Sequence, residues 1–282
     1  MKKPLLIFIF FISIGGISAQ DINVSDALSR MERAIDNAYN EEFTMRDSYY
    51  IGRTVAAHIL GRYRLYTENP ALTNYLNLIC LALAINSPSP NWYNGYYVMV
   101  LDDSSVNAFS TPGGHIFISR GFIELTSSED TLAAIIAHEL AHIQLHHGTA
   151  EIMNSRLIQQ LEQERQRISS NIVNETQQQM FAEMINEITQ TIFTRGYSQL
   201  QEFEADSMAY NLLASAGYNP NSLMELLVIL ERLQGNQLAS LNNTHPQPSQ
   251  RITNLQRQTL TSRTTDNSAV RRERFNRVMG RR

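Results

Sequence analysis

A helical segment with two histidines four residues apart constrains this chain more than any other feature. Within residues 129–147 the sequence reads His138-Glu139-x-x-His142. Positions i and i+4 share a helix face, about 5–6 Å apart at Cβ, so both imidazoles can bind one metal ion. Glu139 lies roughly 100° further round the helix, where it can take a proton from a water that the metal activates. The segment therefore predicts a hydrolytic zinc site with one Zn²⁺ per chain.

The alternative interpretation is a solvated helix that carries two surface histidines. The surrounding residues are apolar, which indicates a buried helix, and buried His and Glu side chains need partners. These apolar residues are Leu132, Ala133, Ile135, Ile136, Leu140 and Ile143. We therefore favour the metal site.

A catalytic zinc needs a third protein ligand and leaves one position for water. Sixty residues after His142, a predicted helix over 198–214 contains Glu202, Glu204 and Asp206. Glu202 and Asp206 are four residues apart and share a face, whereas Glu204 lies about 200° from each. That face can offer Glu202 as the ligand and Asp206 as the carboxylate that orients a metal-bound histidine. Glu204 then has a supporting or structural role, and the alternative for Glu202 is an ordinary surface acid.

Four other histidines are interpreted as structural. His58 lies in an apolar helical run, and His115 begins a strand, where a histidine is more often structural than a ligand. His146 and His147 end the helix of the motif, where a positive imidazole interacts favourably with the helix dipole.

A proline-rich segment over 243–251 contains His245 and Arg251. A rigid loop of this kind is suited to reach over a cleft and stabilise an oxyanion. The residue types alone leave this catalytic role and a purely structural one both open.

The hydrophobic periodicity predicts an α+β fold that is mostly helical. Helices are expected over 25–68 (two helices or one broken helix), 71–85, 129–147 (ending at Gly148), 198–214 and 221–233. The apolar runs 96–101, 106–109 and 115–119 are bounded by turn residues and predict three strands. A small antiparallel sheet should therefore lie beside the helix of the motif.

The composition and the first residues bound the class of protein. The chain has 282 residues, a formal net charge of −4, which gives no general attraction for nucleic acid, and one cysteine, Cys80, which excludes a site with several cysteine ligands. Residues 1–20 combine a basic start, a short apolar run and small residues, and predict a secretory signal peptide. No later segment reaches the roughly 20 apolar residues of a spanning helix. We therefore expect an exported chain with no transmembrane segment after removal of the signal.

The mature chain is expected to form one domain over 21–262, with a long, polar helical insertion at about 151–195. Residues 263–282 hold seven arginines against Asp266 and Glu273. This basic tail is expected to be solvated and flexible, and contact with acidic lipid headgroups or an acidic partner is the alternative.

In this order, the motifs make the chain resemble the minigluzincin zinc peptidases, which include the CAAX prenyl protease, HtpX and BepA-type proteins. The motifs are His138-Glu139-x-x-His142, Glu202-x-Glu204-Ala205-Asp206, Thr244-His245-Pro246 and Arg251, and the run from Asn107 to Ile116 looks like that family's strand-and-turn signature. The resemblance spans roughly residues 45 to 255. It implies a zincin-type metallopeptidase domain.

The resemblance also implies roles for individual residues. His138, His142 and Glu202 would hold Zn²⁺, with Glu139 as general base and Asp206 supporting a ligand. His245 looks like the residue that can close over the zinc and hold the enzyme latent, and Arg251 like a helper for the tetrahedral intermediate.

Substrate binding is expected at the predicted strand over 115–119 and at the glycine turn that precedes it. By the same resemblance, the substrate-binding residues are Gly113, Gly114, His115 and Ile116, and the edge strand that follows Gly113-Gly114 would pair with extended polypeptide substrate, a β-augmentation mode.

These expectations favour a zinc endopeptidase of exported or misfolded proteins, periplasmic or, alternatively, secreted. The polar insertion disfavours prenyl-protein processing, and this chain shows no tetratricopeptide array such as BepA-type proteins carry. The rival is a zinc-stabilised chaperone or assembly factor with little or no proteolysis, for which the Gln-rich residues 151–190 would provide a surface. An exopeptidase would need a group to hold a free terminus, for which Arg251 could serve.

Overall fold

The computed structural model describes residues 44–153, 190, 196–233, 241, 245, 247–257 and 268–280. The predicted signal peptide, the predicted helical residues 25–43 and most of the predicted insertion lie outside the described residues. The elements in chain order are α2 (Met45–Leu60), α3 (Pro70–Ile85), β1 (Tyr97–Leu101), β2 (Ala108–Thr111), β3 (His115–Ser119), α4 (Arg120–Leu125), α5 (Glu129–Gln144), α6 (His147–Met153), α9 (Gln199–Ser215), α10 (Asn221–Arg232), α12 (Pro248–Arg257) and α13 (Ser268–Met279).

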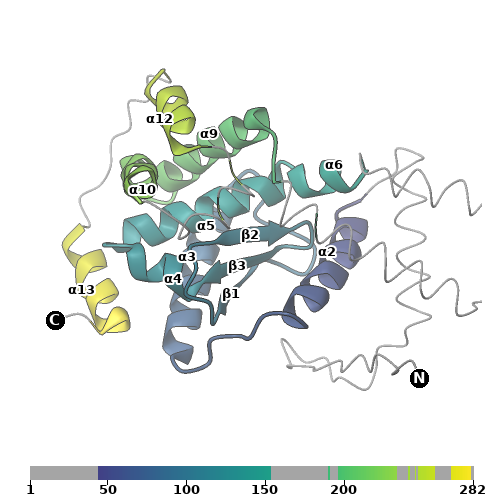
Figure 1. Ribbon diagram of the computed structural model, residues 1–282, viewed down its shortest axis with the longest axis horizontal. Helices are drawn as coiled ribbons and strands as arrows, with labels where there is room; N and C mark the ends of the chain where they lie inside the picture. The colour runs from purple at the N-terminus through teal and green to yellow at the C-terminus, as the bar shows by residue number, and fades with distance from the viewer. Residues whose placement is uncertain are drawn as a thin grey trace, which may run out of the picture.

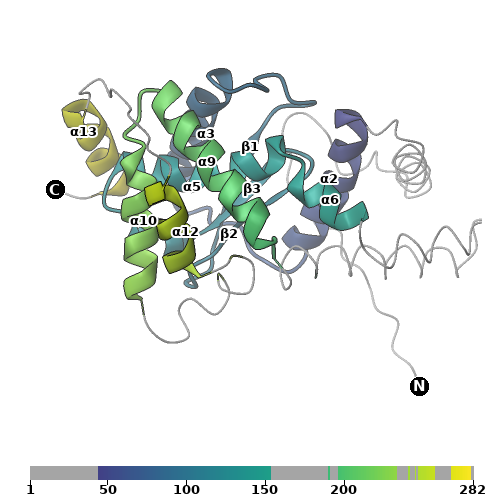
Figure 2. The ribbon, with the colours of Figure 1, turned by 90° about the horizontal axis from the view of Figure 1, so that it is seen from above.

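Helix α5, which carries the His-Glu-x-x-His motif, is the central element. Ser128 caps its first turn in a reciprocal capping box with Thr131. Every residue of α5 except Asp130 is buried, because the helix packs against the sheet, α3, α9 and α10. Both ribbon views place α9, α10 and α12 on the side of α5 that faces away from the sheet (Figures 1 and 2). The predicted α+β fold, mostly helical with a small sheet beside this helix, is confirmed.

The sheet is mixed, which corrects the antiparallel arrangement expected from the sequence. Its strand order is β1-β3-β2, so β3 is the central strand. β1 pairs with β3 in parallel and β2 pairs with β3 in antiparallel fashion. The short turn between β2 and β3 fixes only the second pairing, whereas the first depends on the connection from β1 around the sheet.

The end of the motif helix also differs from the prediction. α5 ends at Gln144, and His146 adopts a left-handed backbone conformation with φ 58°. The chain then turns into α6, so Gly148 lies inside a helix instead of ending one. A Cβ at Gly148 would lie 3.2 Å from the ring of Pro112, so the glycine allows a close approach between α6 and the β2–β3 turn.

The basic C-terminal residues are folded where the structure describes them, contrary to the flexible tail expected from the sequence. Helix α13 buries Phe275 against the core. Its Arg274 binds the carboxylate of Glu129, and Arg271 donates to Asp130 at 3.0 Å. The folded unit therefore extends beyond residue 262 to Met279. None of the described helices is long and apolar enough to span a membrane.

Candidate metal centre

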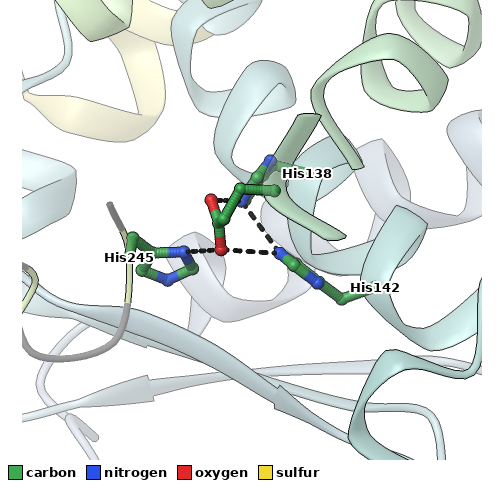
Figure 3. A group of neighbouring side chains, drawn as sticks. His138, His142 and His245 are labelled. Atoms are coloured by element: carbon green, nitrogen blue, oxygen red, sulfur yellow. Dashed lines mark hydrogen bonds and ion pairs between the residues drawn. The ribbon is translucent and has the colours of Figure 1, made fainter. Parts of the chain in front are cut away.

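Four buried side chains from three parts of the chain converge on one point. His138 and His142 come from α5, Glu202 from α9, and His245 from the segment before α12. Each offers one ligand atom, and these atoms all lie within 4.8 Å of one another. Figure 3 shows the rings of His138, His142 and His245 directed toward one another above the sheet. The structure thus brings together the three predicted zinc ligands and His245, the residue expected to close over the zinc.

The separations of the donor atoms suit a zinc ion. The Nε2 atoms of His138 and His142 are 3.1 Å apart. The carboxylate of Glu202 lies 3.4 Å from the first and 3.3 Å from the second. Zn–N and Zn–O distances of about 2.0–2.1 Å in a tetrahedral site place ligand atoms about 3.3 Å apart. Two buried imidazole nitrogens and a buried carboxylate form a donor set that suits a zinc ion.

Asp206 lies where the sequence analysis placed it. One of its carboxylate oxygens is 3.1 Å from Nδ1 of His138, so the carboxylate can hold the proton on that nitrogen and leave Nε2 free. Arg251 on α12 donates from Nε to Asp206 at 2.8 Å, and its Nη1 lies 3.2 Å from Glu202. All three side chains are buried. The arginine compensates the negative charge of two carboxylates that would otherwise be costly to bury.

The side chains that hold the ring of His142 were not predicted from the sequence. Nδ1 of His142 lies 2.9 Å from Nδ1 of His147, a residue that the sequence predicts to be structural at the end of the helix. The ring of Tyr197 stacks on His142 with centroids 3.9 Å apart. His147 is five residues from His142, a spacing that does not share a face on a continuous helix. The helix break at His146 turns His147 toward the site, and no local pattern marked that break.

Glu139 is buried beside the metal ligands. Its Oε2 atom is buried without a hydrogen-bond partner among the described residues. Its Oε1 atom lies 3.8 Å from Nε2 of His245. A buried carboxylate oxygen without a protein partner is costly unless it serves a ligand or water. The position of Glu139 fits the predicted role of general base, and that role remains a prediction.

The electrostatics of the site favour a cation. Burial would lower the pKa of His138, but Glu202 and Asp206 outweigh it and raise the pKa to about 9. Burial holds the pKa of His142 well below its usual value, so its lone pair is available. Burial alone would raise the pKa of Glu202, yet His245, Arg251 and His138 hold it well below its usual range. The ionised carboxylate and the neutral imidazole together form a site that attracts a positive ion.

The predicted substrate strand is wrong in one respect. β3, which begins at His115 and contains Ile116, is hydrogen-bonded on both sides and cannot be an edge strand. Gly113 packs against the backbone of α2, where a Cβ at Gly52 would meet it at 2.0 Å, and Gly114 has φ +89°. These glycines shape the turn. The edge strand beside the metal centre is β2, whose Ala108 carbonyl lies 3.4 Å from Nε2 of His245.

Comparison with known proteins identifies metallopeptidases as the relatives of this chain. A model of peptidase family M48 matches residues 70–259. Mitochondrial metalloendopeptidase OMA1 of Schizosaccharomyces pombe is 28% identical over 159 residues, 54% of this chain and 43% of that protein. Metalloprotease YcaL of Escherichia coli is 25% identical over 148 residues, 52% of this chain and 56% of that protein. The β-barrel assembly-enhancing protease of Escherichia coli is 21% identical over 260 residues, 89% of this chain and 51% of that protein. The chain thus spans about half the length of these relatives, and the resemblance to zinc peptidases is confirmed.

Proposed function

The chain belongs to peptidase family M48, and from this premise we propose that it is a zinc-dependent endopeptidase that cleaves extended polypeptides. One observation carries the proposal. The Nε2 atoms of His138 and His142 and the buried carboxylate of Glu202 lie at zinc-ligand separations, next to Glu139, whose Oε2 atom has no hydrogen-bond partner in the described part of the chain. This arrangement supports peptide hydrolysis more directly than any structural role.

In this proposal each side chain has a separate task. A bound zinc ion lowers the pKa of water and polarises a carbonyl group. Glu139 accepts the proton of the attacking water and passes it to the leaving amine. Asp206 fixes the tautomer of His138, and Arg251 keeps Asp206 and Glu202 ionised. Stabilisation of the tetrahedral intermediate by Arg251 stays a prediction, since its guanidinium already contacts both carboxylates.

Extended substrate is proposed to lie along β2. Ser119 on β3 donates its N–H to the carbonyl of Asn107, so the next residue, Ala108, directs its backbone groups away from β3. Its carbonyl oxygen faces His245 at 3.4 Å. A substrate strand that pairs with this edge would approach the metal centre where His245 now lies, which supports a latent state.

The proposed setting is export of the chain, to the periplasm or, alternatively, out of the cell. The basic and apolar pattern of residues 1–20 supports this proposal. The name of one relative refers to β-barrel assembly and that of another to mitochondria, so the relatives do not decide the compartment. Misfolded exported proteins are the proposed substrates.

A casein assay tests the proposed activity. The purified protein should cleave unfolded casein, a metal chelator should abolish cleavage, and one equivalent of zinc should restore it. Cleavage that is insensitive to the chelator would contradict the proposal. Absence of cleavage by a zinc-loaded His245→Ala protein would contradict it as well. Capture of unfolded protein without cleavage would favour the chaperone alternative.

A further inference from the structure

A chain of contacts leads from His142 to the protein surface. Nδ1 of His142 lies 2.9 Å from Nδ1 of His147, and Nε2 of His147 lies 3.3 Å from Oε2 of Glu204. His142 and His147 are buried, at 1% and 5% exposure. The side chain of Glu204 is 51% exposed. Glu204 therefore ends this chain of contacts in solvent.

The positions of the protons in this chain of contacts follow from the donor inventory. Two nitrogens at 2.9 Å form a hydrogen bond only if one carries a proton and the other accepts it. Nε2 of His142 faces Glu202 and His138 and must be free to bind a metal, so the proton of His142 belongs on Nδ1. His147 then accepts at Nδ1 and carries its own proton on Nε2, which points at the carboxylate of Glu204.

The packing around His142 fixes the plane of its ring but not its tautomer. Tyr197 stacks on the ring of His142 with an interplanar angle of 15°, which holds the plane of the ring. Stacking does not distinguish one ring nitrogen from the other, so the contact that can select the tautomer is the hydrogen bond that His142 donates to His147. The corresponding nitrogen of His138, Nδ1, contacts a carboxylate directly, that of Asp206.

We propose that His147 and Glu204 are positioning residues that select the metal-binding tautomer of His142, His147 directly and Glu204 through His147. The proposal rests on the proposed function, since it concerns one ligand of the same metal. Glu204 is on the face of α9 opposite Glu202, and it is linked to the centre through His147. The two ligands of α5 thus have separate supports, a buried carboxylate for His138 and a histidine–carboxylate pair for His142.

Zinc affinity of the full chain tests the proposal, measured by competition with a chromophoric chelator. His147→Leu removes the acceptor and should weaken zinc binding by about 10- to 100-fold, the usual effect of losing such a partner. His147→Asn places an oxygen near the position of Nδ1 and should recover most of that loss. Glu204→Ala should weaken binding by roughly 10-fold, the low end of the same range, whereas Glu124→Ala, at an exposed acid on α4, should leave it unchanged.

The outcomes separate this proposal from the proposed function. No zinc binding by the unaltered chain would overturn both. Normal zinc binding with equal affinities in all variants would overturn only the positioning role, and so would an equal loss in His147→Leu and His147→Asn, because that indicates packing and not a hydrogen bond. If His147→Leu fails to fold, the half-exposed Glu204 decides: affinity of Glu204→Ala equal to that of Glu124→Ala overturns the proposal.

Discussion

Glu202 and His245, 43 residues apart in the chain, are joined by a hydrogen bond of 2.7 Å between Oε1 and Nδ1. The same carboxylate faces both histidines of α5. His245 thus occupies the side of the metal centre that faces the edge strand β2. A fourth side chain in this position is consistent with a closed, latent form of the enzyme.

Removal of the His245 side chain is expected to activate the enzyme. His245→Ala breaks the bond to Glu202 and opens the approach along β2, so basal cleavage of casein should rise about 5-fold, the effect of a contact worth about 1 kcal/mol. Gln250→Ala, at an exposed residue on α12, serves as control. A lower rate in His245→Ala would indicate a catalytic role instead of a latch.

Substitution of the proposed general base should separate metal binding from hydrolysis. Glu139→Gln keeps the shape of the side chain but cannot accept a proton, so the rate of casein cleavage should fall by roughly 10²- to 10⁴-fold. The zinc content should not change, because Glu139 is not one of the proposed ligands. Retained turnover in a zinc-loaded Glu139→Gln protein would contradict the assignment.

The contact between α13 and the start of α5 is expected to stabilise the fold. Glu129 is fully buried, and Arg274, Tyr75 and Tyr218 are among its partners. Arg274→Ala leaves the buried carboxylate with neutral tyrosine partners and no cation, and it should lower the free energy of unfolding by about 1–3 kcal/mol. Chemical denaturation measures this change, and Arg277→Ala, which removes an exposed ion pair, is the control. Equal effects of the two substitutions would contradict the role of Arg274.

Stability should depend on pH through His115. Burial, with Arg53 adding to it, lowers the pKa of this ring to about 4. The unfolded chain binds the proton near pH 6.5 and the folded chain only near pH 4, so the free energy of unfolding should fall as the pH is lowered through this range. The decrease is at most about 3 kcal/mol and smaller to the extent that water reaches the ring. His115→Asn should flatten this part of the pH profile, and an unchanged slope would contradict the prediction.

Helical periodicity was sufficient to predict most of the metal centre. His138 and His142 share one face of α5, and Glu202 and Asp206 share one face of α9, so spacing alone placed all four. The need of a catalytic zinc for a third protein ligand indicated that the two faces meet, and the resemblance to known peptidases supported that step.

The features that the sequence analysis missed depend on distant parts of the chain. His147 joins the site because the helix breaks at a histidine with positive φ, a conformation more often adopted by glycine. β3 is central because β1 pairs with it from the other side of the sheet. Helix α13 folds because its arginines meet Glu129 and Asp130, which the sequence places about 140 residues earlier.

The metal content of the purified protein tests the central claim most directly. Elemental analysis should find one zinc per chain, and Glu202→Ala, which removes the carboxylate shared by both histidines, should reduce the bound zinc to a small fraction under the same conditions. A chain that binds no zinc, or a Glu202→Ala variant that binds as much zinc as the unaltered protein, would contradict the account.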